Sequence, residues 1–190
     1  IFDAGHLNDG TEVMMARPQG NAPQTPFAPA PIAEVAARIL SEKPEAVFAP
    51  HVETSAGMIL PDAYIKAMAE AAHEVGALMV LDCIASGAAW VDMKALGVDV
   101  LVSAPQKGWS ASPSAGIVVM GPRAEARLEA TTSDSFALDL KKWRAIMKAY
   151  EDGGHAYHAT MPTDALAGLR DAMVETREMG FDAAKQAQCA

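Results

Sequence analysis

The stretch that decides the fold of this chain is DVLVSAPQKGWSASPSAGIVVM, residues 99–120. It opens with an apolar run at residues 100–102 and closes with a second one at residues 117–120. Between them lies a loop of glycine, serine and proline that carries a single lysine, Lys107. Short apolar runs bounded by Gly and Pro predict strands, so the lysine is expected at the mouth of a buried strand.

Similar apolar runs alternate with helical patterns in the first half of the chain. The runs at residues 46–49 and 78–81 predict two further strands. Strands that are apolar on both faces and separated by helices indicate a parallel sheet. The expected fold class is therefore α/β, a mostly parallel sheet flanked by helices. The expected helices cover residues 32–40, which Pro44 ends, residues 62–75, with Gly76 at the C-cap, residues 93–96, residues 143–150, and residues 163–190, with Thr163 as N-cap.

Composition and charge exclude several classes of function. The chain has 190 residues, 51% hydrophobic and 21% charged, as expected for one soluble globular domain. Its net charge of −9 repels phosphate backbones, so no nucleic-acid partner is expected. No apolar run approaches the roughly 18 residues of a membrane span. The two cysteines, Cys83 and Cys189, form no disulfide framework, so a cytoplasmic protein is expected.

Polar side chains follow three of the expected strands where each strand ends. Residues 51–55 follow the first strand, Asp82 ends the second, and Gln106 and Lys107 follow the third. In a parallel sheet these ends meet at one edge, where open α/β sheets bind their ligands. We therefore expect the binding site at this edge.

Asp82 and Lys107 carry opposite charges that need partners away from water. One alternative is a structural ion pair between them, and the other gives each a separate partner on one small molecule. A lysine in a low-dielectric pocket loses part of its preference for the ammonium form, and its neutral amine can form a Schiff base with an aldehyde. The carboxylate would then hold a ring nitrogen protonated. Gly108 leaves room for such a ligand, and Ser103 and Gln106 offer donors to a phosphate.

Four segments together carry a family resemblance. They are HVETSAGMILP (51–61), ALMVLDCIASG (77–87), VLVSAPQKG (100–108) and YHATMP (157–162). In this order and spacing they resemble the class V aminotransferases, fold-type I enzymes that depend on pyridoxal 5'-phosphate (PLP), and most of all the alanine–glyoxylate and serine–glyoxylate aminotransferase branch. The resemblance implies ping-pong transfer of an amino group from an amino acid to a 2-oxo acid such as glyoxylate or pyruvate.

The resemblance also implies roles for single residues. Lys107 would carry the Schiff base and move the proton at the substrate α-carbon, while Asp82 would pair with the pyridine nitrogen. Thr54 would bind the phenolic oxygen of PLP, and Gln106 would reach its phosphate. Near the lysine the chain departs from the family pattern, and we expect Trp109 to narrow the substrate pocket.

A homodimer follows from the same resemblance. The segment YHATMP of one subunit completes the phosphate site of the other, and Tyr157 and Thr160 occupy the matching positions. Residues 1–162 are expected to form part of the large PLP-binding domain, and residues 163–190 a helix leading toward a C-terminal small domain. The chain opens without Met and closes within a helical pattern, so both ends are expected to be cuts within a longer protein. The family's phosphate loop and substrate-binding arginine are expected beyond these ends.

Three other functions stay open. One is a PLP-dependent lyase of the same fold, similar to desulfurases or kynureninases, although Cys83 directly follows a strand-end carboxylate and is badly placed as a nucleophile. The others are a phosphate-ligand-binding module without covalent chemistry, which no Gly-x-Gly-x-x-Gly or Walker sequence supports, and an inactive dimerisation scaffold.

The histidines do not predict a metal site. His51 with Glu53, and His155 with His158, each provide two ligands without a third at a fitting spacing. We expect His51 as a polar wall near the cofactor. Ser86 joins either a hydrogen-bond network at the strand ends or the solvent.

Overall fold

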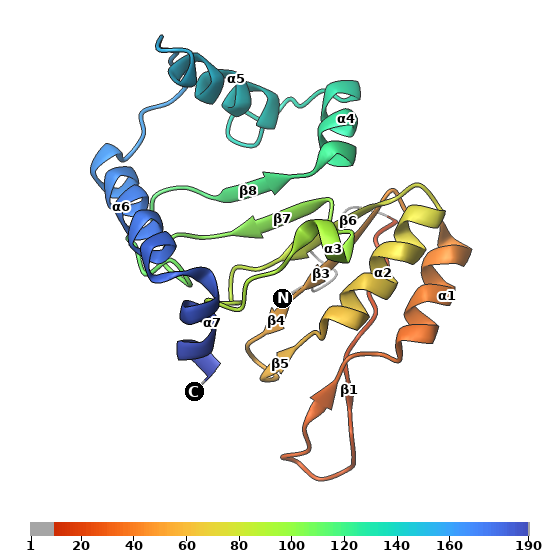
Figure 1. Ribbon diagram of the computed structural model, residues 1–190. Helices are drawn as coiled ribbons and strands as arrows, with labels where there is room; N and C mark the ends of the chain where they lie inside the picture. Colours follow the sequence, from red (N-terminus) through yellow and green to blue (C-terminus); the bar gives the residue numbers. More distant parts are fainter. Residues whose placement is uncertain (1–9, 190) are drawn as a thin grey trace.

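A four-stranded sheet organises the chain in the computed structural model, which describes residues 10–189 (Figure 1). Its strand order is β3-β6-β7-β8, in which β3, β6 and β7 are parallel and β8 is antiparallel to β7. The expected α/β class with a mostly parallel sheet is confirmed. Of the expected domain ranges, residues 1–9 and residue 190 lie outside the described part.

Short antiparallel pairs and seven helices complete the described structure. The strands β1 and β2 pair with each other, as do β4 and β5. The strands are β1 (Arg17–Pro18), β2 (Phe27–Ala28), β3 (Ala46–Pro50), β4 (Val52–Glu53), β5 (Met58–Ile59), β6 (Leu78–Asp82), β7 (Val100–Ser103) and β8 (Ile117–Met120). The helices are α1 (Ile32–Glu42), α2 (Asp62–Glu74), α3 (Met93–Leu96), α4 (Pro122–Ala130), α5 (Leu140–Glu151), α6 (Thr163–Met179) and α7 (Phe181–Cys189).

The core lies between the sheet and the helices α1 and α2, which run side by side (Figure 1). Side chains alternate along a strand, so Met79 and Leu81 of β6 point into this core and are fully buried. Burial of each stabilises the fold by about 2 kcal/mol. Phe48 of β3 points to the opposite face and stays 48% exposed. Among the described residues, therefore, the face of the sheet that α1 and α2 cover is much more buried than the opposite face.

The helix boundaries follow the backbone preferences of Pro and Gly, with three corrections. Helix α1 ends before Pro44, as expected. The C-cap of α2 is Val75 and not the expected Gly76, which takes a left-handed φ of +80° one residue later. The prediction of Thr163 as N-cap is wrong, because Pro162 holds that position and Thr163 is the first helical residue. The expected helix to the C-terminus is also interrupted at Gly180, whose φ is +90°. None of the described helices is both long and apolar enough to cross a lipid bilayer.

A buried carboxylate fastens the amino ends of the strands. Asp99 is only 4% exposed and precedes β7. Its Oδ2 accepts the backbone N–H of Met79 at 2.8 Å and lies 2.9 Å from Nε2 of His73, while Nε of Arg123 lies 3.2 Å from Oδ1. Asp99 thereby connects α2, β6, β7 and α4. Nothing in the local sequence pattern predicted this network.

We expect Asp99→Asn to lower the free energy of unfolding by about 2 kcal/mol, because it removes the charge that balances Arg123 and disturbs a buried hydrogen bond. Urea unfolding followed by circular dichroism measures the loss. Asp134→Asn, at an exposed loop carboxylate, is the matched control and should change little. Equal stability of the two variants would contradict a fastening role for Asp99.

Candidate active site

The carboxyl ends of the parallel strands bring three of the predicted site residues to one edge of the sheet. Asp82 ends β6 and is in register with Pro50 of β3 and Val102 of β7. Thr54 lies in the turn between β4 and β5, directly beyond β3, and Lys107 lies in the loop directly beyond β7. The expected convergence at this edge is therefore present.

Lys107 lies on a tight turn and is exposed. The backbone N–H of Ser110 donates to the carbonyl of Lys107 at 3.0 Å, and that of Ala111 donates to Pro105 at 3.0 Å. Within residues 10–188 no hydrogen bond or ion pair engages Nζ of Lys107. The low-dielectric pocket expected around this amine is not formed by the described residues, since the side chain of Lys107 stays exposed.

The carboxylate of Asp82 is half-buried and has one oxygen engaged. Its Oδ1 accepts the backbone N–H of Ile84 at 2.9 Å, and its carbonyl accepts the backbone N–H of His51 at 2.8 Å. No ion pair joins it to Lys107 in the described part of the chain. The alternative of a structural ion pair is therefore not realised, and Oδ2 remains available to a ligand.

The loops that follow β6 and β7 pack against each other through two glycines. A Cβ added to Gly108 would stand 2.5 Å from the carbonyl carbon of Gly87, which is far too close. The expectation that Gly108 leaves room for a ligand is thus wrong, because the backbone of Gly87 fills that space. Beside this contact, the rings of Trp109 and Trp90 lie 5.0 Å apart. The lysine loop is therefore held directly on the loop that carries the aspartate.

Tyr157 and Thr160 lie on a separate segment between α5 and α6 (Figure 1). Their hydroxyl oxygens are 3.2 Å apart, and Tyr157 is 80% exposed. His158 lies 2.7 Å from the carbonyl of Phe136 and packs on its ring. No interaction of the described chain joins Tyr157 or Thr160 to Lys107 or Asp82.

His51 and Ser86 form a buried pair that the sequence analysis did not identify. Both are 4% exposed, and Nδ1 of His51 lies 2.7 Å from Oγ of Ser86. Burial lowers the pKa of His51, with a smaller raising effect from Asp62 and a still smaller lowering effect from Lys185. His51 is therefore a neutral, buried ring, and its expected place as a polar wall facing a ligand is wrong. Ser86 belongs to the hydrogen-bond network and not to the solvent.

Cys83 is buried next to this pair, with its Sγ 4.0 Å from Nδ1 of His51. Burial raises the pKa of the thiol to about 11, so the thiolate is scarce at neutral pH. Among the described residues, no group of three or more His, Cys, Asp or Glu side chains is arranged to hold a metal ion.

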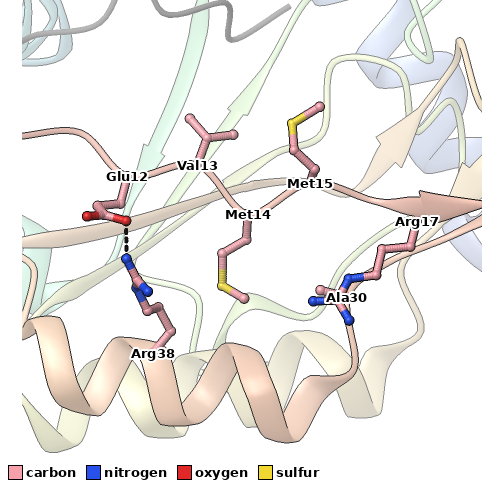
Figure 2. A pocket seen from close by; sticks show the side chains of 7 residues that line it. All are labelled: Glu12, Val13, Met14, Met15, Arg17, Ala30 and Arg38. Carbon is pink, nitrogen blue, oxygen red and sulfur yellow. Dashed lines mark hydrogen bonds and ion pairs between the residues drawn. The ribbon is translucent and has the colours of Figure 1, made fainter.

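A hollow of about 310 Å³ lies elsewhere, against α1 (Figure 2). The extended segment at residues 12–15 runs alongside the helix, and Glu12 of the segment forms an ion pair with Arg38 of the helix. Arg17, which also lines the hollow, is paired with Glu34 at 2.6 Å. Both arginines that line the hollow, Arg17 and Arg38, already have carboxylate partners. No residue from the carboxyl ends of the sheet strands lines the hollow, so it is not the candidate active site.

A model of the family described as aminotransferase class V matches residues 30–189. The chain belongs to the class V aminotransferases. It is 29% identical over 152 residues to alanine–glyoxylate aminotransferase of Callithrix jacchus, covering 78% of this chain. It is 33% identical over 141 residues to 2-aminoethylphosphonate–pyruvate transaminase of Paraburkholderia phymatum, covering 74% of this chain.

A solved structure shares the fold of this class V chain. Alanine–glyoxylate aminotransferase from Nostoc sp. superposes with a TM-score of 0.71 at 27% identity, over 81% of this chain and 40% of that one. The chain spans 36% of the length of each of the two relatives named above. Family and fold expected from the sequence are confirmed, and PLP is the cofactor of this family.

The donor set at the sheet edge fits PLP. Lys107 has an unengaged amine, the kind of group that bonds to an aldehyde, and Asp82 has a carboxylate oxygen of the kind that pairs with a protonated ring nitrogen. Thr54 and Gln106 are exposed, and within the described residues their side chains have no hydrogen-bond partner. They supply a hydroxyl and an amide of the kinds that bind a phenolic oxygen and a phosphate.

We expect Gly108→Ala to push the lysine loop off the aspartate loop, because the new methyl group would overlap the backbone of Gly87. PLP affinity, measured by absorbance titration, should fall about tenfold or more. Gly116→Ala adds a methyl group in open space and should bind as wild type. If Gly108→Ala bound PLP with the wild-type affinity, the contact between the two loops would not be needed for PLP binding.

We also expect the thiol of Cys83 to resist alkylation. In a Cys189→Ser background, iodoacetamide at pH 8 should react at least about 100-fold more slowly with the folded protein than with the urea-unfolded one, because the raised pKa and burial both lower thiolate access. Mass spectrometry at timed intervals gives the two rates. Comparable rates would mean that Cys83 is an accessible nucleophile.

Proposed function

We propose that this protein is a PLP-dependent aminotransferase that transfers an amino group from an amino acid to a 2-oxo acid. The observation that carries the proposal is the position of Asp82 and Lys107 at the ends of adjacent parallel strands, on loops that touch through Gly87 and Gly108. An acid and an amine on adjoining loops are the two groups that a carbonyl cofactor with a basic ring nitrogen requires.

When bound, PLP supplies an electron sink for the charge left on the substrate α-carbon. Lys107 would hold the cofactor through Nζ and would also take the proton from the substrate α-carbon. Asp82 would keep a proton on the ring nitrogen, through the oxygen that the backbone of Ile84 leaves unengaged. Thr54 would donate its hydroxyl toward the phenolic oxygen, and the amide of Gln106 would donate to the phosphate.

We propose a homodimer in which Tyr157 and Thr160 complete the phosphate site of the partner subunit. Supporting this, Tyr157 is 80% exposed, and its hydroxyl binds Thr160 and no group of its own sheet edge among the described residues. A set of exposed apolar side chains on the same part of the chain offers surface to a partner. They are Phe136, Leu138, Met147 and Tyr150.

Glyoxylate or pyruvate is the proposed amino acceptor. The similar proteins are an alanine–glyoxylate aminotransferase and a 2-aminoethylphosphonate–pyruvate transaminase, whose names contain these two small 2-oxo acids.

A lyase of the same fold is the second candidate. Cys83 is disfavoured as the nucleophile of a desulfurase, because its thiol is buried and its pKa is raised to about 11.

We expect the full-length protein with PLP to show a visible absorbance band that borohydride bleaches, and Lys107→Ala to lack it, because only a lysine amine forms the reducible bond. Lys66→Ala, at an exposed lysine of α2, is the matched control and should keep the band. A band that survives in Lys107→Ala would refute the assignment of this lysine.

A panel of amino donors with glyoxylate or pyruvate then separates the two enzyme classes. An aminotransferase converts donor and acceptor in equal amounts, whereas a lyase consumes the donor without an acceptor. Consumption of the donor alone would move the protein to the lyase class.

A further inference from the structure

The loop from Asp82 to Gly87 is fastened at both of its ends. At one end, the carbonyl of Asp82 accepts the backbone N–H of His51. At the other end, Gly87 presses on Gly108, the residue after Lys107. The separation between the carboxylate and the amine therefore depends on how this loop is held in between.

The side chains of His51 and Ser86 hold the loop next to its Gly87 end. They are two of the three buried polar or charged residues in the described structure, and their hydrogen-bond distance is 2.7 Å. His51 cannot move easily, because its backbone N–H and carbonyl are both engaged, the latter by the N–H of Leu60 at 2.8 Å. Ser86 is the residue before Gly87, so its anchor lies next to the contact with the lysine loop.

Other contacts of the loop come from the far end of the chain. The side chain of Gln188 in α7 donates to the carbonyl of Ser86 at 3.2 Å and accepts the backbone N–H of Ala88. On the loop, both bonds involve backbone groups and no side chain. Within the described structure, two buried side chains of the loop contact His51, the residue after β3: the hydroxyl of Ser86 at 2.7 Å and, more distantly, the thiol of Cys83 at 4.0 Å.

We propose that His51 and Ser86 are positioning residues that set the separation between Asp82 and Lys107. The inference rests on the proposed function. Neither side chain is accessible to a ligand, since both are 4% exposed, so the pair acts through the loop and not on the cofactor. A displacement of about 1 Å at a reacting group is enough to change rates about 100-fold, so a single anchor of this kind has a measurable effect.

The test uses the full-length protein with added PLP and five variants, one of which is the control. Ser86→Ala and His51→Leu each remove the hydrogen bond, and the double variant tests whether the two residues act as a unit. His51→Asn keeps a polar atom near the position of Nδ1. Ser41→Ala removes an exposed serine hydroxyl from α1 and is the control. Urea unfolding, the Kd for PLP and the pH midpoint of the visible band are measured for each protein.

We expect Ser86→Ala and His51→Leu to weaken PLP binding about tenfold and to shift the pH midpoint of the band by about one unit, with no further effect in the double variant. His51→Asn should recover most of both properties, and Ser41→Ala should match wild type. If the variants lose only stability and keep the wild-type Kd and midpoint, the pair is structural and the inference is overturned. If wild type itself forms no band, the proposed function fails, and this inference with it.

Discussion

The parallel pairing of β3, β6 and β7 is the constraint on which the rest of this structure depends. Parallel strands put all their carboxyl ends at one edge, so residues that are far apart in sequence are brought together without any direct attraction between them. Asp82 and Lys107 share this edge although no ion pair joins them in the described chain. The amine and the acid are thus left for a third group, which a mutual salt bridge would have prevented.

Close backbone contact then converts a shared edge into a defined arrangement. Gly87 and Gly108 approach more closely than any side chain would permit. The adjacent strands alone would only bring the two loops near each other, whereas this contact fixes their relative position. Trp109 and Trp90 pack beside the contact. The side chain of Lys107 nevertheless stays exposed, because the described residues support its loop from one side and do not enclose the amine.

Much of this architecture could be predicted from the sequence, and the reason is local. Apolar runs located the strands, and Pro44 and Gly76 marked helix ends, because these signals arise within a few residues of chain. The same apolar runs predicted Asp82 at the end of one strand and Lys107 just beyond the end of the next. By contrast, the antiparallel direction of β8 and the N-cap at Pro162 depend on the geometry of the assembled chain.

The buried polar pairs could not be predicted for a related reason. His51 and Ser86 are separated by 35 residues in the sequence, and Asp99 and His73 by 26 residues. The two members of each pair come into contact only when the sheet has formed, so a local sequence pattern cannot reveal them. The side chain of His51 was expected as a polar wall near the cofactor. Strand alternation instead turned it inward, where burial lowers the pKa of its ring.

The docking of α7 on the loop beyond β6 has a consequence for the order in which the protein folds. Gln188 and Ala88 are separated by 100 residues, and Trp90 donates to the carbonyl of Phe181 across 91. Contacts of such long range close late, because the intervening chain must be ordered first. On a ribosome, the sheet can therefore assemble while its functional edge is still unfinished, and that edge acquires its final shape only after the seventh helix has emerged and docked.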